Sequence, residues 1–268
     1  MALGGGMGEN RSDMAVSPQH FSEVEGLRVQ FRLRGEGKPL LMLHGWGQSS
    51  LSFVGAASQL EQRFRILTPD LPGFGFSEAP PEAWGSADYA RVVAELVKTA
   101  GFESVDVVGH SRGGTIALAL ATAYPELVKR MVIVASPIVR LPVEAGMRRA
   151  SLRYSLVKGL ARAVPPLRGR MLDWGRNRFG SADYRAAGPL RSTMVRVVNE
   201  DWGPALPAIE APVLLIWGSE DTEVPLRVAQ EAMELLPRAE LVTLEGVGHF
   251  PFLVALEAFV EAVGTFLG

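Results

Sequence analysis

The stretch VDVVGHSRGGTIALAL, Val105 to Leu120, places a short polar cluster between β-branched residues and a long apolar segment. The residues before the cluster predict a buried strand, and those after it predict a helix. Within the cluster, the pentapeptide GHSRG at 109–113 matches the pattern G-x-S-x-G. Glycines suit both ends of this pattern, because the chain must reverse direction within a few residues where a Cβ atom would clash. The stretch therefore predicts a strand, a tight turn that carries Ser111, and a helix.

Short apolar runs, each bounded by Gly, Pro, Ser or Asp, recur on both sides of this stretch, as in strands buried on both faces of a parallel sheet. Helical patterns separate most of them, and Ser86 is the predicted N-cap of one such helix. Two segments at the start, HFSEVEG and LRVQFRLRG, predict an antiparallel pair. The alternation predicts an α/β fold with a doubly wound, mostly parallel sheet. The predicted buried strands are KPLLMLHG, FRILTPD, SVDVVGH, VKRMVIVAS and APVLLIWG, and the helices cover residues 51–62, 86–101, 115–128 and 224–236.

The alternation breaks once, in a part of the chain that has helical patches and prolines but no strand pattern. We interpret this part, residues 137–205, as a helical lid insertion over the sheet. Residues 18–136 and 206–268 then form one α/β core, which a chain of 268 residues can accommodate. Residues 1–17 are rich in glycine and polar residues and predict a disordered tail.

The composition is that of a soluble globular protein, with 47% hydrophobic residues, 21% charged residues and a net charge of −2. No feature of the composition points to nucleic acid. The lack of cysteine excludes disulfides, thiolate metal sites and a cysteine nucleophile, and it fits a reducing compartment, so we expect a cytoplasmic protein. The start does not resemble a secretory signal, and no apolar run approaches the length of about 20 residues that a membrane span needs. No phosphate loop or metal-ligand spacing is present, so we expect no cofactor.

A serine hydroxyl becomes a nucleophile only with a base, a group that orients the base, and donors for the oxyanion. The chain has four histidines, of which His20 precedes the first strand, His44 ends a strand and His110 adjoins the serine. His249 remains as the candidate base for Ser111. It lies in LEGVGHFPF, a loop between the strand-like segment AELVTLE and the last helical pattern.

The orienting acid should follow the end of a strand, because open α/β sheets assemble their sites at the carboxyl ends of the strands. Asp221 in LLIWGSEDTEVP has this position, and Glu220 and Glu223 are its neighbours and rivals. Asp70 and Asp106 are more consistent with structural roles. The alternative interpretations are a helix cap for Ser111, a loop histidine with a structural role for His249, and a turn residue for Asp221.

Five motifs follow one another along the chain: HGWG at 44–47, DLPGFGFS at 70–77, GHSRGG at 109–114, GSEDTEVP at 218–225 and GVGHFPF at 246–252. In this order they resemble the α/β-hydrolase fold superfamily in its serine esterase type, from about His20 to Gly268. The resemblance implies that the backbone N–H groups of Trp46 and Arg112 form the oxyanion hole. Dehalogenases and epoxide hydrolases of this fold carry an aspartate where this chain has Ser111, so the resemblance excludes their chemistry. The HGWG form is similar to that of the pimeloyl-carrier-protein methyl ester esterases.

The resemblance implies hydrolysis of a small to medium carboxylic ester through an acyl-enzyme, with Ser111 as nucleophile, His249 as base and Asp221 as the orienting acid. Two kinds of alternative remain open. One keeps the same residues but uses them for amide or carbon–carbon bond hydrolysis, perhydrolysis or acyl transfer. The other is a ligand receptor on the same fold, because a fold does not fix a function.

Charge is distributed unevenly along the chain. Residues 137–205 contain twelve arginines and one lysine against five acids, a net charge of +8, so the rest of the chain carries −10. The simpler interpretation is a solvated basic face that pairs with the acidic core. The alternative is a surface that attracts an acidic acyl carrier, since patches of one sign raise association rates.

Overall fold

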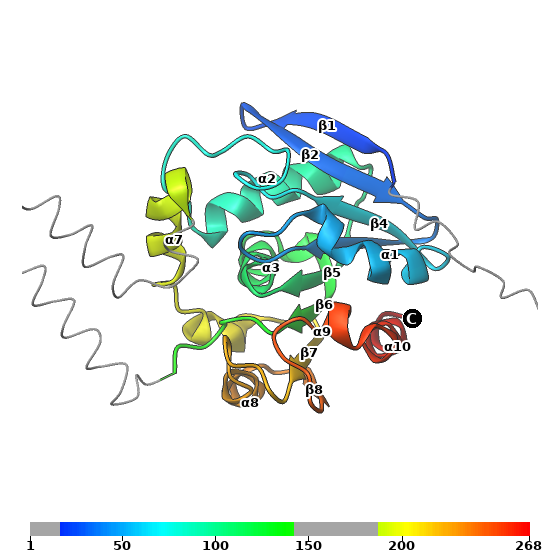
Figure 1. The fold of residues 1–268 in the computed structure, drawn as a ribbon, viewed down its shortest axis with the longest axis vertical. Coiled ribbons are helices and arrows are strands. Elements are labelled where there is room, and N and C mark those ends of the chain that lie inside the picture. Colours follow the sequence, from blue (N-terminus) through cyan, green and yellow to red (C-terminus); the bar gives the residue numbers. More distant parts are fainter. Residues whose placement is uncertain (1–16, 142–186) are drawn as a thin grey trace, which may run out of the picture.

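The computed structural model describes residues 17–141 and 187–268, which form one eight-stranded sheet with helices on both faces (Figure 1). The strand order is β1-β2-β4-β3-β5-β6-β7-β8, in which β2 pairs antiparallel with β1 and β4 and all other pairs are parallel. The predicted fold class and all the predicted strands are confirmed. The strands are β1 Gln19–Val24, β2 Leu27–Arg34, β3 Lys38–Leu43, β4 Phe64–Pro69, β5 Val105–His110, β6 Val128–Val134, β7 Val213–Gly218 and β8 Ala239–Leu244.

Alternate side chains of the central strands enter two separate cores, because successive residues of a strand point to opposite faces of a sheet. In β5, for example, Val105 and Val107 lie in one core and Val108 in the other. Helices α2 Ser86–Thr99, α3 Arg112–Ala123 and α8 Arg227–Leu235 cover the first core. The second lies under α1 Val54–Leu60, α9 Pro251–Val254 and α10 Leu256–Leu267, with the 3₁₀ turn η1 Ser50–Phe53 before α1.

Two local predictions were wrong. The helix expected over 115–128 ends at Ala123, because Pro125 has no N–H group to continue it, and a short 3₁₀ turn, η2 Pro125–Leu127, leads into β6. Ser86 is the first residue of α2 and not its cap. The N-cap is Gly85, whose N–H group donates to Asp88 Oδ2 at 2.8 Å. The hydroxyl of Ser86 is thereby free to make contacts outside its own helix.

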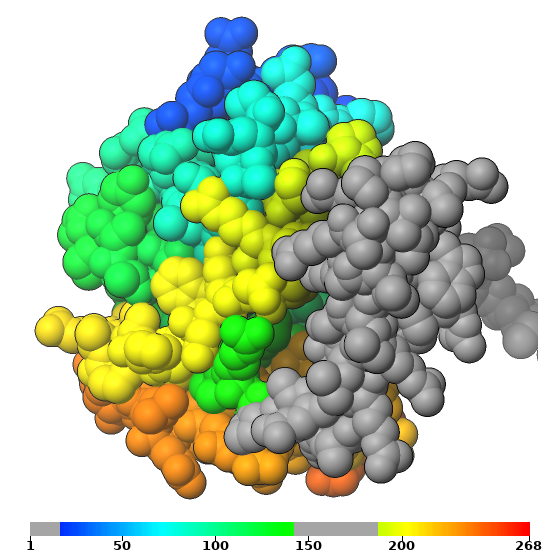
Figure 2. Space-filling model, turned by 90° about the vertical axis from the view of Figure 1, so that its left-hand side faces the viewer, coloured from blue at the N-terminus to red at the C-terminus, as the bar shows by residue number. Residues whose placement is uncertain are grey.

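Part of the predicted insertion belongs to the described residues. Residues 187–205 contain η4 Gly188–Leu190, α7 Arg191–Val197 and the start of η5 Gly203–Ala208. Residues 142–186 of the insertion, and 1–16 of the predicted tail, lie outside the described residues. The segment from η4 to η5, yellow in Figure 2, crosses this face of the molecule between the part that contains α2 and the part that contains α8. Of the two helices, α8 contacts η5. In the described part of the chain, no helix has the length and apolar character needed to span a membrane.

Candidate active site

Ser111 forms the junction between β5 and α3 in a strained backbone conformation, with φ 50° and ψ −115°. A positive φ at a non-glycine residue costs about 1–3 kcal/mol and persists only when the surroundings enforce it. Three hydrogen bonds do so here. The N–H group of Ser111 donates to the carbonyl of Val134 at 2.8 Å, and its own carbonyl accepts from Ser136 Oγ at 2.5 Å and from the N–H group of Gly114 at 3.0 Å.

The glycines around Ser111 are required by close backbone contacts. A Cβ atom on Gly109 would lie 2.5 Å from the carbonyl oxygen of Gly113, and one on Gly113 would overlap the carbonyl of Leu43 in β3. Any side chain at either position would therefore separate α3 from the sheet. The spacing of the G-x-S-x-G pattern follows from these two contacts.

Asp221 and His249 form a buried pair. Asp221 follows β7, and its Oδ2 atom lies 2.8 Å from Nδ1 of His249. Its other oxygen, Oδ1, accepts from the N–H groups of Glu223 and Val224, each at 2.9 Å. The carboxylate is thus held in one orientation. A carboxylate can only accept, so His249 Nδ1 carries the proton and neutral His249 has a free lone pair on Nε2.

The rival acid Glu223 has a different environment. Its Oε2 atom lies 3.7 Å from His249 Nε2, beyond hydrogen-bonding distance, and its side chain is 57% exposed. Glu220 is also exposed. Of the three acids, only Asp221 lies within hydrogen-bonding distance of His249 in the described structure.

His110 connects the loop of His249 to the turn at Ser111. Its ring is buried, and its Nε2 lies 2.8 Å from the carbonyl oxygen of His249, which can only accept a hydrogen bond. The two imidazole rings have centroids 4.8 Å apart. Burial, followed by the neighbouring His249, lowers the pKa of His110 to about 3. His110 is therefore neutral and donates from Nε2.

The loop that carries Trp46 lies against the same turn. A Cβ atom on Gly45 would be 3.2 Å from Cβ of Ser111, and the N–H group of Gly45 donates to Gln48 Oε1 at 2.7 Å. Gln48 Oε1 is also 3.1 Å from Nδ1 of His110. Trp46 packs its half-buried ring edge-on against Phe74, with centroids 5.0 Å apart. The backbone at Gly45, which precedes Trp46, thus lies beside Ser111, which precedes Arg112.

A cavity of about 340 Å³ opens beside this loop. Its lining side chains are uncharged and mostly apolar, so it suits an uncharged group of a ligand. The lining residues are Trp46, Gly47, Gly73, Phe74, Ala79, Ala187, Pro189 and Leu190.

His44, the first residue of HGWG, makes hydrogen bonds that hold the loop of Trp46. Its Nδ1 donates to the carbonyl of Gly45 at 2.8 Å, and its Nε2 accepts from the N–H group of Leu71 at 2.9 Å. Only a neutral imidazole satisfies both partners, because a proton on Nε2 would face the N–H of Leu71. Burial accordingly lowers the pKa of His44 to about 4.

We expect acid to destabilise the protein through His44 and His110. In the unfolded chain each binds a proton near pH 6.5, whereas in the folded state the pKa is lowered to about 4 and about 3. Their contribution is therefore complete above pH 6.5 and is lost as pH falls toward 3, by about 2 kcal/mol per pH unit around pH 5 for the two rings together. Urea denaturation at pH 7, 6 and 5 measures this loss. NMR signals of either ring that titrate near pH 6.5 in the folded protein would contradict the prediction.

The other predicted residues take part in contacts within the fold. Asp70 accepts from the N–H groups of Ser50 and Phe76 at 2.7 and 2.8 Å, and Asp106 pairs with Arg130 at 2.8 Å. Residues 75–79, GFSEA, hold a second serine two residues after a glycine but have alanine in place of the second glycine, and they form a loop.

Sequence reasoning missed the residues that join these loops to one another. They are Gln48, His110 and Ser136, which contact His110, the carbonyl of His249 and the carbonyl of Ser111 respectively. The only sequence signal was adjacency to a motif. For His110, adjacency to Ser111 did not indicate that its ring contacts the loop of His249.

Curated relatives cover nearly all of the chain. An uncharacterised protein of Mycobacterium tuberculosis is 32% identical over 95% of this chain and 82% of its own length. The 2-hydroxymuconate semialdehyde hydrolase of a Pseudomonas species is 29% identical, with 94% and 96% covered. The pimeloyl-[acyl-carrier protein] methyl ester esterase of Nitrosomonas europaea is 31% identical, with 87% and 97% covered.

A solved structure with the same fold is that of a membrane phospholipase A described as a bacterial virulence factor. It superposes with a TM-score of 0.76 at 26% identity, over 95% of this chain and 86% of that one. The sequence model of the alpha/beta hydrolase family matches residues 40–262, which include the turn at Ser111 and the loops of Asp221 and His249. The chain belongs to the alpha/beta hydrolase family.

Proposed function

We propose that this hydrolase is a serine esterase that cleaves a small to medium carboxylic ester through an acyl-enzyme. The observation that carries the proposal is the buried pair of Asp221 and His249, whose loop is hydrogen-bonded to His110 beside the strained Ser111. A purely structural role for His249 in its loop would not require a buried carboxylate, that of Asp221, which two further N–H groups hold in one orientation. The lack of cysteine is consistent with a cytoplasmic location.

In the proposed mechanism, Nε2 of neutral His249 accepts the proton of Ser111 as the hydroxyl attacks the ester carbonyl. Asp221 keeps the proton on Nδ1 and stabilises the imidazolium that forms. The N–H groups of Trp46 and Arg112 bind the negative oxygen of the tetrahedral intermediate. The imidazolium then gives its proton to the leaving alcohol, and a water molecule repeats the sequence to release the acid.

The relatives and the cavity support an ester substrate. The Nitrosomonas relative is named as a methyl ester esterase, and the cavity beside Trp46 has an uncharged lining that suits an acyl or alkoxy group. The Pseudomonas relative is named as a 2-hydroxymuconate semialdehyde hydrolase, so carbon–carbon bond hydrolysis with the same residues is the second candidate. The carboxylate of a 2-hydroxymuconate semialdehyde would have to bind near a cavity whose lining, among the described residues, has no charged side chain.

The proposal is tested with a panel of p-nitrophenyl and methyl esters of increasing acyl length, followed by product analysis. We expect one equivalent each of acid and alcohol, with kcat/KM in the common enzymatic range of about 10⁴–10⁵ M⁻¹s⁻¹ for the best ester. Tight ligand binding with turnover slower than about once per minute on every ester would identify a receptor instead. Faster cleavage of a 2-hydroxymuconate semialdehyde than of any ester would favour the second candidate.

Adding a carrier-bound acyl ester to this panel tests an acidic acyl carrier as partner. The arginines that motivate this proposal, such as Arg148 and Arg149, lie outside the described residues, and the charge of +8 over 137–205 is the support. Between low and physiological salt, kcat/KM should fall steeply for a carrier-bound acyl ester and stay level for a small neutral ester. If Arg148→Glu with Arg149→Glu leaves both substrates equally good, the carrier proposal fails.

A further inference from the structure

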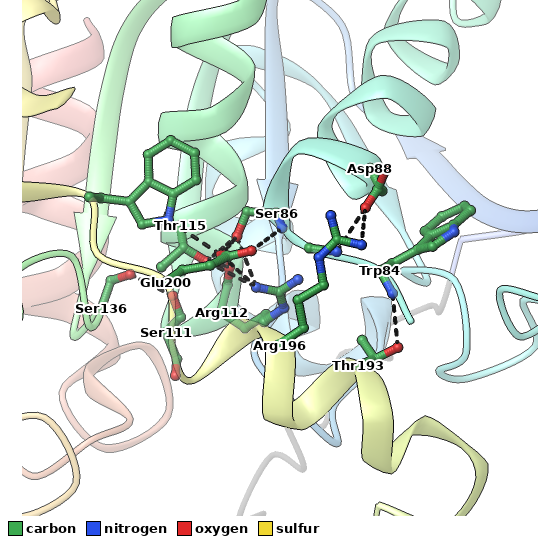
Figure 3. A network of polar contacts seen from close by, with 12 residues as sticks. Trp84, Ser86, Asp88, Ser111, Arg112, Thr115, Ser136, Thr193, Arg196 and Glu200 are labelled. Carbon is green, nitrogen blue, oxygen red and sulfur yellow. Dashed lines mark hydrogen bonds and ion pairs between the residues drawn. The ribbon is translucent and has the colours of Figure 1, made fainter. Parts of the chain in front are cut away.

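The side chain of Arg112 extends from the turn at Ser111 into a buried polar network (Figure 3). Only 6% of Arg112 is exposed. Its Nη1 donates to Ser86 Oγ at 2.9 Å and lies 3.6 Å from Glu200 Oε2, and the guanidinium carbon is 4.9 Å from the centroid of the Tyr89 ring. The residue after the nucleophile is thus tied to α2 and to the segment that follows α7.

Glu200 is the acid of this network. Its Oε1 accepts from the N–H group of Ser86 at 2.7 Å, at the first turn of α2, and its Oε2 accepts from the hydroxyl of Ser86. Trp202 Nε1 lies 3.4 Å from the same Oε2 atom. The carboxylate therefore holds together three separate parts of the chain: the start of α2, the start of α3 and the segment between α7 and η5.

The pairing of Arg112 is incomplete. Its Nε and Nη2 atoms are buried and have no hydrogen-bond partner among the described residues. Burial lowers the pKa of Arg112 to about 10, and the charge of Glu200 is the first of the effects that oppose this. A buried guanidinium with a single acid partner depends strongly on that partner, because removing it leaves an uncompensated charge.

A displacement of this guanidinium would shift the backbone of Arg112, and with it the turn at Ser111, because Arg112 directly follows Ser111 in the chain. Arg112 begins α3, and its carbonyl accepts from Thr115 Oγ1 at 2.9 Å. The preceding residue is already held at φ 50° by its surroundings. A small rotation of this turn would redirect the N–H group of Arg112, and oxyanion donors act only within a narrow geometry.

We propose that Glu200 is a positioning residue that fixes, through the side chain of Arg112, the backbone N–H group of Arg112 that binds the oxyanion. The inference rests on the proposed function. It makes the C-terminal end of the predicted insertion a part of the active site, although Glu200 touches no reacting atom. Its contribution is expected in the transition state, so kcat should change and KM should not.

Asp88 provides a matched control for a purely structural role. Its Oδ2 atom accepts from the N–H group of Gly85 at the same end of α2, and it lies 3.3 Å from Nη1 of Arg196 in α7. Asp88→Asn therefore weakens the same helix start as Glu200→Gln does, together with a contact between α2 and the neighbouring α7. Arg112 pairs with Glu200 and not with Asp88 (Figure 3).

The first experiment measures kcat and KM of Glu200→Gln and Asp88→Asn per active site, titrated with an organophosphonate that labels Ser111. We expect Glu200→Gln to lower kcat about 10- to 100-fold with KM within about threefold, and Asp88→Asn to stay within about twofold in both. Affinity for a trifluoromethyl ketone, which forms an oxyanion on Ser111, should fall in parallel with kcat/KM. Equal losses in the two variants, or a loss in KM alone, would overturn the inference.

The second experiment tests whether Glu200 acts through Arg112. Arg112→Met keeps the backbone N–H group and removes the buried charge, so Glu200→Gln should cost less than about threefold in that background. The double variant also guards against misfolding, because it leaves no unpaired buried charge. An undiminished cost in the Arg112→Met background would refute the coupling. Lack of labelling at Ser111 in the wild type would instead refute the proposed function, whatever Glu200 does.

Discussion

Replacing Ser111 by Ala is expected to lower kcat about 10³-fold or more, which leaves only the contributions of oxyanion binding and substrate positioning. An organophosphonate should label the wild-type protein once, at Ser111, and abolish ester hydrolysis in proportion to the adduct. The reason is geometric as well as chemical. The hydroxyl projects from a turn at φ 50°, and the buried His249 and His110 lie on the adjacent loop and strand end.

Ser77 is the natural control for this prediction, because it lies in the second serine motif, at 75–79. Its hydroxyl donates to the carbonyl of Asp70 at 2.6 Å and accepts from the N–H group of Gln30 at 2.9 Å. Ser77→Ala should cost stability, which urea denaturation measures, and keep the labelling at one equivalent. Mass spectrometry that places the adduct on Ser77, or on any serine other than Ser111, would remove the basis of the proposed mechanism.

The architecture could be predicted from local patterns because each pattern had one dominant physical cause. Continuous apolar runs such as VLLIWG at 213–218 must be covered on both faces, and that burial is what the sheet provides. The glycines at 109 and 113 could be interpreted without coordinates, since few other circumstances need two glycines around a serine. The end of the helix at Ala123 was predicted wrongly because the apolar pattern continues past Pro125, although proline has no N–H group to continue a helix.

The contacts between loops could not be predicted in the same way. Glu200 and Ser86 are 114 residues apart, and nothing in either local sequence indicates that the carboxylate of Glu200 accepts a hydrogen bond from the first N–H group of α2. Ser86 looked like a cap because serine usually serves its own helix. His110 and Gln48 are similar cases, since His110 contacts the carbonyl of His249 and Gln48 lies 3.1 Å from His110, each far away along the chain. Such pairings depend on tertiary geometry, which single-sequence patterns do not contain.

The second large effect is expected for Asp221→Asn, which should lower kcat about 10²- to 10⁴-fold while the fold stays intact. The structure supplies a specific reason. Oδ1 of Asp221 accepts two N–H groups, from Glu223 and Val224, so the oxygen of an asparagine must take that place. Its NH₂ group would then face Nδ1 of His249, which must become an acceptor. The imidazole proton would move to Nε2, the atom that has to accept the proton of Ser111.

The matched variant is Glu223→Gln, which changes the acid nearest to Nε2 of His249 but lies 3.7 Å away with a 57% exposed side chain. It should keep kcat/KM within about threefold. Both variants should have urea midpoints close to wild type, since neither loses a backbone contact or creates a cavity. If Asp221→Asn retained more than about a tenth of the wild-type rate while Glu223→Gln lost most of it, Glu223 would be the orienting acid. The proton of His249 would then have to sit on Nε2 in the resting enzyme, and Nδ1 could not be the donor that the Asp221 contact requires.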